Sequence, residues 1–383
     1  MKIKINNQTI TDSTKEYQKG DLFLLTTQNK IYHTTQKVIT PKELLKNIKT
    51  KFIGITGTNG KTTTAFIIGY ILDKLGYKVG IQGTEGFFIN SKKVESKTLT
   101  TPPIITTIKR VYEYDLDFFV MEVSSHSIVQ NRIDGIKFDL KIFTNLSQDH
   151  LDYHHSLQEY KKVKESFFKD NILKIINKKY NLNINKTNSY FYPLKDKFPT
   201  KLKGEFNQEN LQAALLGLSK LLNIDIFKLS EITKNFKGIS GRMEEVGDKI
   251  IVDFAHTPDG IEKVLNSIKS QKIVVFGAGG NRDKTKRKLM GEVTDKYSDY
   301  IILTNDNPRC EDEIEIIEDI KKGIKNTPFE IILDRYQAIQ KALKIQNNRY
   351  IFILGKGDEK YIEKCNEKIV FNDKETILKF LNS

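Results

Sequence analysis

The sequence predicts an α/β protein in which helices flank largely parallel sheets. From residue 50 onward, short apolar segments alternate with segments of helical periodicity, an order typical of doubly wound sheets. Several apolar segments lead directly into polar or glycine-rich residues, and such strand ends are where open α/β sheets bind ligands. With 383 residues the chain is too long for one ordinary core, so we expect more than one domain.

The individual elements follow from local pattern. Residues 1–47 predict a few short strands and turns. The apolar segments that follow predict strands at 51–56, 78–82, 118–123, 140–146, 250–254, 272–276, 300–304 and 350–354. Helical periodicity between them predicts helices that include 62–75, 156–169, 210–222 and 260–270.

Two changes of pattern divide the chain into three predicted domains. The first lies where the short N-terminal strands give way to the alternating pattern. The second lies near 238–242, where a Gly-Ile-Ser-Gly turn precedes a new series of strands and helices. We therefore expect domains at 1–47, 48–240 and 241–383. Residues 176–203 are rich in Lys and Asn with interleaved Tyr and Phe, which predicts a hairpin insertion on the surface.

The composition argues against secreted and membrane-spanning classes. No apolar run approaches the roughly 18 residues that a spanning helix needs, and the N-terminus lacks the apolar block of a signal peptide. The chain has two cysteines, Cys310 and Cys365. Two cysteines cannot form a disulfide framework, and they fit a reducing compartment. We therefore expect a cytoplasmic protein without membrane insertion.

The basic residues favour small anionic partners over nucleic acid. The net charge is +14, and a positive field attracts nucleotides, acidic metabolites and nucleic acid alike. Only eight of the 62 basic residues are arginine, and the lysines are spread over nearly every predicted helix, so we expect a solvated surface and no nucleic-acid partner. Arginine suits bidentate contact with carboxylate and phosphate, and several arginines lie in glycine-rich or polar segments: Arg132, Arg242, Arg282, Arg287 and Arg309.

Residues 54–63, Gly-Ile-Thr-Gly-Thr-Asn-Gly-Lys-Thr-Thr, form the strongest local motif. They follow an apolar strand and open a helix, which is the context of a phosphate-binding loop. Glycines let backbone N–H groups face phosphate oxygens, the helix N-terminus adds partial positive charge, and Lys61 neutralises the distal phosphates. The Thr62 hydroxyl is suited to Mg²⁺. The usual pattern has Gly where this chain has Ile55, so the motif is a variant. The alternative is a glycine-rich turn without a ligand.

Further polar residues follow the next predicted strands of this domain. Glu122 ends the strand 118–123, where a carboxylate across from a phosphate loop would be a second contact for Mg²⁺. Residues 144–154 close another strand with a dense polar cluster. Its histidine and acids could ligate a metal, or Asp149 and Asp152 could cap the helix that begins near Ser156.

Four strand ends in the last third of the chain are also polar. Asp253 and His256 follow one strand, and the glycine turn at 277–284 follows the next. Asn-Asp-Asn-Pro-Arg at 305–309 and Gly-Lys-Gly-Asp-Glu at 355–359 follow two more. Each could be a solvated turn, but parallel strands bring their carboxyl ends to one edge of a sheet. Together they predict a binding face.

Taken in order, these segments resemble the Mur ligase superfamily. The matching segments run from residue 54 to 359: TGTNGKTTT, TTP, MEVSSHSIVQNRIDG, FTNLSQDHLDYH, GEFNQENLQAA, ISGRMEEV, VDFAHTPD, GAGGNRDKTKR, DNPR and GKGDE. The resemblance implies a three-domain fold with a short N-terminal α/β domain for the UDP end of the substrate, a central P-loop ATPase domain and a C-terminal Rossmann-like domain. The N-terminal domain resembles the family only in Thr-Asp-Ser at 11–13 and Gly-Asp-Leu-Phe at 20–23, and is shorter than usual.

The resemblance also implies the substrates and the residues that contact them. The family branch it favours adds meso-diaminopimelate to UDP-N-acetylmuramoyl-L-alanyl-D-glutamate, using ATP and Mg²⁺. The implied ATP contacts are Gly57, Thr58, Asn59, Gly60, Lys61, Thr62, Thr63, Asn207, Asn210, Arg242 and Asp253. The implied contacts with the UDP-linked dipeptide are Ser13, Thr100, Thr101, Ser124, Gln130 and Arg132. The implied amino-acid contacts are Arg282, Asp306, Asn307, Pro308, Arg309, Gly355 and Glu359.

A metal-binding and catalytic group is implied by the same comparison. Thr62, Glu122 and His150 would lie on the metal side, with Lys61 at the phosphates. Lys164 lies 14 residues after His150, where the family has a lysine that CO₂ converts to a carbamate, a carboxylate-like ligand for a second Mg²⁺. The alternative is an exposed lysine in the run of Lys161, Lys162 and Lys164.

Amino-acid specificity rests on Arg309. Meso-diaminopimelate differs from lysine by a distal carboxylate, for which Arg309 offers a bidentate partner, and lysine-adding relatives lack this arginine. The last motif has Asp358 where the family usually has His, while Glu359 is kept. The alternatives are a lysine-adding or other Mur or folylpolyglutamate-type ligase, and a nucleotide-binding module without ligase activity. We expect a monomer.

Overall fold

The computed structural model of the protein describes residues 1–32, 35–96, 99–365 and 367–382. The chain divides into two compact units. One unit comprises Met1–Leu146, Tyr160–Thr200 and Glu209–Phe236. The other comprises Ser147–Glu159, Lys201–Gln208 and Lys237–Ser383.

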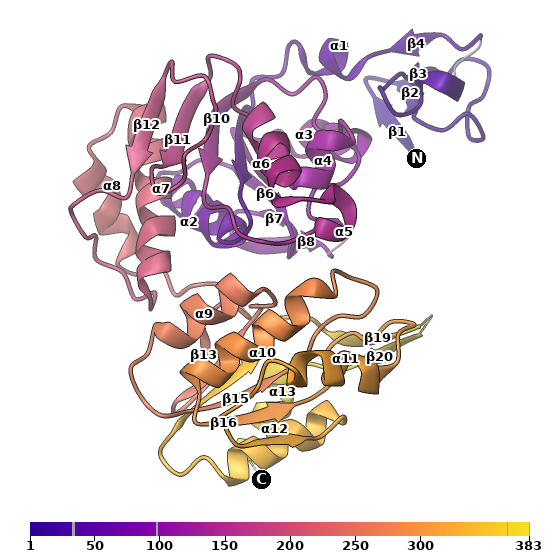
Figure 1. The fold of residues 1–383 in the computed structure, drawn as a ribbon. Coiled ribbons are helices and arrows are strands. Elements are labelled where there is room, and N and C mark those ends of the chain that lie inside the picture. Colours follow the sequence, from indigo (N-terminus) through magenta and orange to yellow (C-terminus); the bar gives the residue numbers. More distant parts are fainter. Residues whose placement is uncertain (33–34, 97–98, 366, 383) are drawn as a thin grey trace. The chain divides into compact units, whose positions relative to one another are not determined.

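A small sheet forms the N-terminal part of the first unit (Figure 1). Its strands occur in the order β1-β2-β3-β4, with β1 and β2 antiparallel and the other pairs parallel. This matches the short strands and turns predicted for this segment. The elements are β1 (Lys2–Ile5), β2 (Gln8–Thr11), β3 (Leu22–Leu24), the 3-10 helix η1 (Lys30–Tyr32), β4 (Val38–Ile39) and α1 (Pro41–Leu45).

The second sheet has eight strands in the order β12-β11-β10-β5-β9-β6-β7-β8. All neighbours from β12 to β6 are parallel, while β7 and β8 add an antiparallel edge. The strands are β5 (Lys51–Thr56), β6 (Val79–Gly83), β7 (Gly86–Ile89), β8 (Lys92–Glu95), β9 (Phe118–Glu122), β10 (Phe138–Phe143), β11 (Leu173–Asn177) and β12 (Ser189–Tyr192). The helices of this stretch are α2 (Lys61–Lys74), α3 (Ile104–Tyr114), α4 (Ser125–Val129), α5 (Leu151–His154), α6 (Leu157–Ser166), α7 (Glu205–Leu222) and α8 (Ile226–Thr233).

Strand β5 occupies the middle of this sheet and sets the position of the phosphate loop. It lies between β10 and β9, and five of its six residues are buried, as expected of a parallel strand covered on both faces. In the register of β5 and β9, Ile55 lies opposite Glu122. The loop that begins at Gly57 therefore leaves the sheet beside Glu122.

The predicted surface hairpin at 176–203 is wrong. Strands β11 and β12 are parallel neighbours that extend the sheet, as the adjacent magenta and pink arrows in Figure 1 show. Tyr192 of β12 is buried, and its hydroxyl donates to the backbone oxygen of Phe143 at 2.9 Å. Residues 178–188 form the crossover that a parallel pair requires. Their polar composition reflects this exposed crossover, whereas the flanking strands are short and partly aromatic.

The third sheet forms the core of the second unit, in the order β13-β14-β18-β15-β16-β17. Strand β13 is antiparallel to β14, and all other neighbours are parallel. The strands are β13 (Glu244–Gly247), β14 (Ile250–Asp253), β15 (Lys272–Phe276), β16 (Tyr300–Leu303), β17 (Phe329–Ile331) and β18 (Tyr350–Leu354). The helices are α9 (Pro258–Asn266), α10 (Thr285–Tyr297), α11 (Glu313–Lys321), α12 (Arg335–Lys344) and α13 (Asp373–Leu381). A separate hairpin consists of β19 (Tyr361–Lys364) and β20 (Glu367–Val370).

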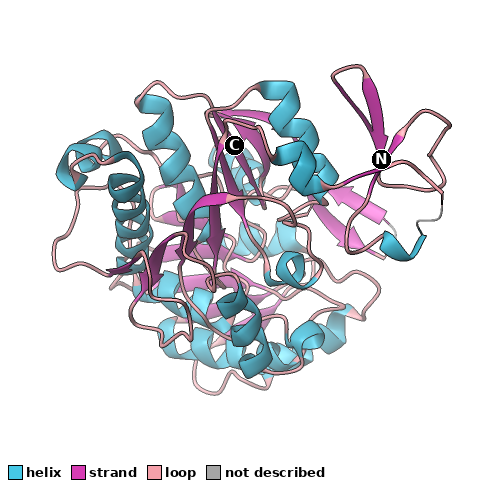
Figure 2. Ribbon diagram, turned by 90° about the horizontal axis from the view of Figure 1, so that it is seen from above, coloured by secondary structure: helices cyan, strands magenta, loops and turns pink. Residues whose placement is uncertain are grey.

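Helices cover both faces of this third sheet, and Figure 2 shows the helices (cyan) and strands (magenta) of the chain. Ile251 and Val274 pack with residues of α9, α10 and α11, whereas their neighbours Val252 and Val275 pack with α12 and α13. This alternation follows from the period of two in a strand. The arrangement is Rossmann-like, and the predicted α/β class is confirmed.

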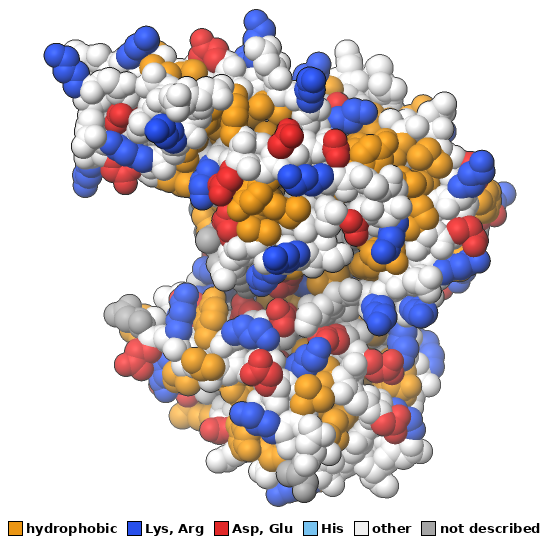
Figure 3. Space-filling model, turned by 180° about the vertical axis from the view of Figure 1, so that it is seen from behind, with side chains coloured by type: hydrophobic (Ala, Val, Ile, Leu, Met, Phe, Trp, Pro, Cys, Tyr) orange, Lys and Arg blue, Asp and Glu red, His pale blue; other side chains and the backbone are white. Residues whose placement is uncertain are grey.

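The surface agrees with the lysine-rich pattern of the sequence. On the face in Figure 3, Lys and Arg side chains are scattered among Asp and Glu and form no continuous stripe. Among the helices in the described ranges, none combines the length and the apolar character that a membrane crossing requires.

Candidate functional site

The phosphate loop connects β5 to α2 and depends on glycine at two places. Gly60 has φ +83, and a Cβ there would lie 2.4 Å from Oδ1 of Asn210. Gly57 has φ +153, and a Cβ there would lie 1.9 Å from the Thr144 hydroxyl. The Asn59 N–H donates to Oδ1 of Asn145 at 2.8 Å, which fixes the tip of the loop. The predicted contacts Thr58 and Thr63 are also buried here.

Two lysines converge on one carbonyl of this loop. The Lys61 ammonium donates to the backbone oxygens of Gly57 (2.9 Å) and Thr58 (2.8 Å). The Lys164 ammonium, on α6, donates to the same Gly57 oxygen at 3.0 Å. Lys164 is only 1% exposed and lies over the Tyr160 ring. The alternative of an exposed helix lysine is therefore wrong for Lys164.

Glu122 is held by hydroxyl and backbone donors at the end of β9. The Thr62 hydroxyl donates to Oε1 at 2.9 Å. Thr84 donates its N–H to Oε1 (2.9 Å) and its hydroxyl to Oε2 (3.0 Å). A Cβ on Gly83 would lie 2.1 Å from Oε1, so the carboxylate packs directly on this backbone. The sequence analysis missed Thr84, although a Gly-Thr pair directly after a predicted strand was the available signal.

The donor atoms of Thr62 and Glu122 suit a magnesium ion. Mg²⁺ is bound by one or two protein oxygens together with substrate phosphates and water, and these two side chains supply a hydroxyl and a carboxylate next to a phosphate loop. In the described ranges, no group of three or more His, Cys, Asp or Glu side chains lies close enough together to hold a metal. The residues therefore fit a metal that is shared with a phosphate ligand.

Hydrogen bonds connect five of the six residues predicted for the dipeptide substrate to Glu122, either through Thr84 or through the Glu122 backbone. Thr100 and Thr84 lie within hydrogen-bond distance through their hydroxyls (3.2 Å), and the Thr101 hydroxyl donates to the backbone oxygen of Glu122 (2.8 Å). Ser124 caps α4 and donates its N–H to the Thr101 hydroxyl at 3.0 Å. Arg132 donates to the Thr101 carbonyl (2.9 Å) and pairs with the Gln130 amide. Ser13 does not join them; its N–H donates to the Thr11 hydroxyl beside the N-terminal sheet.

His150 and its neighbour Asp149 belong to the second unit. His150 has φ +56, and its Nε2 lies 3.3 Å from Oδ2 of Asp149. Asp149 is buried and also pairs with Lys286 at 3.3 Å. Burial alone would raise the pKa of Asp149, but the charges of Lys286, His150 and His256 hold it well below its ordinary value. Asp149 does not cap the helix near Ser156, because the Ser156 hydroxyl accepts the Glu159 N–H itself.

Helix α7 carries the two predicted asparagines. Asn210 lies against Gly60, as described above, and is buried in the first unit. Asn207 belongs to the second unit, where its amide donates to the Lys203 carbonyl at 2.8 Å. The structure therefore places Asn210 at the phosphate loop, whereas Asn207 remains a prediction.

Asp253 lies at the carboxyl end of β14 in the third sheet, and Arg242 lies near it. Asp253 ends β14 and accepts N–H groups from Met243 and Ala255, both at 2.7 Å. Burial raises the pKa of Asp253, and the nearby Arg242 opposes that shift. The Arg242 guanidinium lies 4.2 Å from the centre of the Phe254 ring.

A buried polar network joins the two predicted amino-acid motifs. The Asn307 amide donates to Oε2 of Glu359 at 2.8 Å. Lys356 is fully buried and donates to Oδ1 of Asn307 (3.0 Å) and to Oε2 of Glu359 (3.1 Å). Gly355 has φ +107, and a Cβ there would lie 2.2 Å from Oδ2 of Asp306. The sequence analysis did not single out Lys356, which holds the network together.

A buried ion pair, Arg335 with Asp373, contacts the strand ends that lead into these loops. The Arg335 guanidinium, fully buried, forms a bidentate ion pair with Asp373 at 2.7 and 2.8 Å. It also donates to the carbonyls of Asn305 (3.1 Å) and Leu354 (2.9 Å). These carbonyls follow β16 and end β18, so Arg335 ties together the two strand ends that lead into Asp306 and Gly355.

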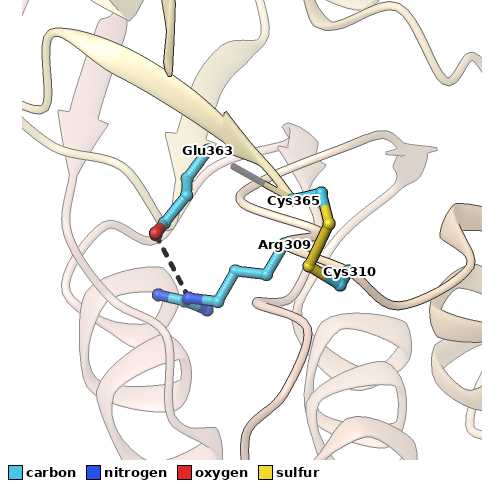
Figure 4. The surroundings of a disulfide bond; sticks show 4 residues. All are labelled: Arg309, Cys310, Glu363 and Cys365. Atoms are coloured by element: carbon cyan, nitrogen blue, oxygen red, sulfur yellow. Dashed lines mark ion pairs between the residues drawn. A yellow bond between two sulfur atoms is a disulfide. The ribbon is translucent and has the colours of Figure 1, made fainter. Parts of the chain in front are cut away.

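Arg309 and Arg282 form a cationic pair beside this network. Arg309 Nη1 donates to the Gly280 carbonyl at 2.7 Å, and its Nε lies 3.2 Å from Oε2 of Glu363 (Figure 4). A Cβ on Gly279 would lie 3.0 Å from Arg309 Nη1 and 3.8 Å from Arg282 Cγ. Burial and the Arg309 charge lower the pKa of the Arg282 guanidinium. Two adjacent guanidinium groups favour an anionic ligand.

The same loop carries an unexpected disulfide. Pro308 packs against Gly280, whose Cβ would lie 1.9 Å from the Pro308 carbonyl oxygen. Cys310 is bonded to Cys365, whereas the sequence analysis took the two cysteines to fit a reducing compartment. That expectation rested on the small number of cysteines. A count of cysteines does not indicate whether the fold places two of them side by side.

Comparisons with known proteins identify the family of this chain. Residues 55–191 match the Mur ligase middle domain, and residues 241–357 match the Mur ligase, glutamate ligase domain. A UDP-N-acetylmuramoyl-L-alanyl-D-glutamate--2,6-diaminopimelate ligase of Wolinella succinogenes is 41% identical, and the match covers 97% of this chain and 96% of that protein. The ligase of the same name from Helicobacter pylori is 40% identical, with coverages of 96% and 93%. A solved structure of a ligase of this name has a TM-score of 0.62 at 25% identity, with coverages of 97% and 94%. The chain belongs to the Mur ligase family.

Proposed function

We propose that this protein is the ATP-dependent ligase that adds meso-diaminopimelate to UDP-N-acetylmuramoyl-L-alanyl-D-glutamate in peptidoglycan precursor synthesis. The observation that carries this proposal is the match, at about 40% identity and nearly full length on both sides, to ligases named for this reaction. The cationic pair of Arg282 and Arg309 supports the amino acid named, because its distal centre bears a carboxylate that lysine lacks.

The reaction needs a leaving group on a carboxylate. In the proposed route, an oxygen of the D-glutamyl γ-carboxylate attacks the ATP γ-phosphorus, giving an acyl phosphate and ADP. The neutral amine of diaminopimelate then attacks the acyl carbon, and phosphate leaves as the amide forms and the nitrogen loses a proton. Positioning and charge neutralisation supply most of the catalysis in such transfers.

The first unit would hold the nucleotide and the acceptor carboxylate. Lys61 and the N–H groups of 57–63 are assigned to the ATP phosphates, and the hydroxyls near Thr101 to the dipeptide. Thr62 and Glu122 would hold Mg²⁺, which when bound neutralises phosphate charge. His150 remains a proposed group on the metal side. Asn207, Arg242 and Asp253 remain proposed ATP contacts, and Ser13 a proposed contact with the uridine end.

We assign Lys164 as the site of a carbamate. Its amine is buried beside the phosphate loop, where addition of CO₂ with loss of a proton would create an anionic oxygen ligand. Lys164→Ala should lower the ligation rate by at least tenfold, and a short carboxylate such as acetate should restore part of it. Lys162→Ala, at the exposed position two residues earlier, is the matched control. A wild-type rate in Lys164→Ala would refute this role.

Amino-acid choice is tested by ADP release with diaminopimelate, lysine and D-glutamate as alternative acceptors. We expect turnover with diaminopimelate and far less with lysine. Arg309→Ala should raise KM for diaminopimelate by about 10- to 100-fold, because one charge-assisted bidentate contact is lost. Better turnover with lysine, or an unchanged KM in Arg309→Ala, would contradict the assignment. Uridine recognition by residues 1–47, a monomeric state and a cytoplasmic location remain predictions.

A further inference from the structure

The disulfide lies next to the residue assigned to the distal carboxylate, Arg309. Cys310 directly follows Arg309, and Cys365 follows β19, the strand that carries Glu363 (Figure 4). We propose that Cys310 and Cys365 are a thiol–disulfide exchange site whose state sets how firmly Arg309 is held for the amino-acid substrate. This inference rests on the proposed function, since it takes Arg309 as a substrate contact.

Both cysteines are accessible to reagents. Cys310 and Cys365 are each exposed to solvent. Thiol–disulfide exchange requires a thiolate to reach a sulfur atom, so exposed bonds exchange with small thiols and buried ones resist them. The bond between these cysteines is therefore open to exchange in the folded protein.

Little apolar packing holds the hairpin that carries Cys365. Strands β19 and β20 form a two-stranded sheet of their own, which a β-bridge between Lys364 and Arg309 joins to the neighbouring segment, and an isolated two-stranded hairpin is marginally stable. All four residues of β20 are exposed. The disulfide closes a loop of 55 residues between this hairpin and the Arg309 segment, so it removes much of the freedom that the hairpin would otherwise have.

The remaining ties between the two segments are polar. The Arg309 N–H donates to the Glu363 carbonyl at 2.9 Å, and the Cys365 N–H donates to the Arg309 carbonyl at 2.7 Å. Lys364 pairs with Glu313 at 2.9 Å, but the Lys364 side chain is 57% exposed. Exposed pairs contribute little. The Glu363 N–H also donates to Asn307 Oδ1 at 2.8 Å, and the Glu363 carboxylate pairs with Arg309. The hairpin is therefore held to the Arg309 segment by a few polar contacts and the disulfide.

Movement of the hairpin would act directly on the Arg309 guanidinium. Among the described residues, the partners of this guanidinium are the Glu363 carboxylate and the Gly280 carbonyl. Without the disulfide, the hairpin moves more freely, and Glu363 moves with it. The Glu363 carboxylate then holds the Arg309 guanidinium in place for a smaller fraction of the time. The substrate must then order this side chain as it binds. The cost of ordering one long side chain corresponds to about a three- to tenfold increase in KM.

Low-molecular-weight disulfides accept the electrons and protons that the exchange transfers, and dithiols supply them. In oxidation by a low-molecular-weight disulfide, one protein thiolate attacks a reagent sulfur, forms a mixed disulfide and expels one reagent thiolate. The second protein thiolate attacks the protein sulfur of that mixed disulfide and expels the other. The protein loses two electrons and two protons, and the reagent becomes two thiols. A dithiol reductant reverses the sequence.

The test compares the full-length enzyme after treatment with oxidised glutathione and after treatment with dithiothreitol. Intact mass and alkylation report the state of the cysteines, and ADP release reports KM for diaminopimelate and for ATP. We expect the reduced enzyme to have a three- to tenfold higher KM for diaminopimelate and an unchanged KM for ATP. The double variant Cys310→Ser/Cys365→Ser should behave as the reduced wild type and ignore both reagents.

A further variant tests whether the effect passes through Arg309. Glu363→Gln keeps both cysteines, so reduction should change its KM by less than it changes that of the wild type. An equal response in this variant would overturn the proposed route. Cysteines that stay fully alkylatable after oxidised glutathione, or equal KM values in both states, would overturn the exchange site while ligation still supports the proposed function. Absence of ligation in both states would instead refute the function on which the inference rests.

Discussion

Replacing Lys356 by Met should weaken binding of the amino acid and leave binding of ATP unchanged. The Lys356 side chain is fully buried, and its ammonium donates to Asn307 Oδ1 at 3.0 Å and to Glu359 Oε2 at 3.1 Å. Methionine has an unbranched, flexible side chain that fills irregular space. The variant therefore keeps most of the packing and loses both hydrogen bonds.

The size of the effect follows from these contacts. A hydrogen bond to a charged group contributes about 1.5–3 kcal/mol. In the variant, Glu359 still accepts a hydrogen bond from the Asn307 amide at 2.8 Å. The carboxylate is therefore held less firmly but keeps the Asn307 donor. With about 1.4 kcal/mol for each factor of ten, we expect KM for diaminopimelate to rise about 10- to 100-fold. The free energy of unfolding should fall by about 3 kcal/mol, because a largely buried carboxylate loses its cation.

The assay measures ADP release, first with diaminopimelate varied at saturating ATP and then with ATP varied at saturating diaminopimelate. Lys360→Met is the matched control, because the Lys360 side chain belongs to the same segment, is 59% exposed, and lies 3.5 Å from Asp358 and from Glu375. We expect both of its KM values to stay within about twofold of wild type. The reasoning is refuted if folded Lys356→Met raises KM for diaminopimelate no more than Lys360→Met does.

Two further predictions concern other residues. Thr84→Val removes the 3.0 Å donor to Glu122 Oε2, so kcat should fall about tenfold and the Mg²⁺ concentration for half-maximal rate should rise; an unchanged Mg²⁺ titration would contradict this role. Glu311→Gln should reduce stability at pH 7 by about 2 kcal/mol, because hydrogen bonds from Arg287, which outweigh burial, hold the pKa of Glu311 below its ordinary 4.5. A carboxylate whose pKa is lower in the folded state stabilises the protein above the unfolded pKa. The difference in free energy of unfolding between wild type and variant should therefore shrink as the pH falls below 4.5. Urea unfolding from pH 7 to pH 3.5 measures this difference, and a difference that stays constant would count against the ion pair.

Local chemistry made the phosphate loop predictable. The sequence at 54–63 contains its glycines, its lysine and its hydroxyls in one segment, and the flanking apolar pattern identifies strand and helix. The structure starts α2 at Lys61 and ends β5 at Thr56, close to the predicted 62 and 56. Glu122 was also predictable, because the end of a parallel strand beside this loop leaves its side chain at the same edge of the sheet.

Features that depend on tertiary pairing were not predictable in the same way. Strand β12 is partly exposed and aromatic, and only its place beside β11 distinguishes it from a surface hairpin. Lys356 lies in a glycine-rich turn that predicts a solvated lysine, yet the approach of Asn307 buries it. The Cys310–Cys365 bond joins segments 55 residues apart, and neither sequence segment contains a signal for the other.

The central claim is that the dipeptide carboxylate is activated by phosphate from ATP and captured by diaminopimelate. It is tested most directly by incubating the enzyme with Mg²⁺, ATP, diaminopimelate and UDP-linked dipeptide labelled with ¹⁸O in the γ-carboxylate. We expect tripeptide product, ADP in equal amount, and inorganic phosphate that carries one ¹⁸O atom. AMP as the nucleotide product, phosphate without label, or ADP without tripeptide would contradict the account.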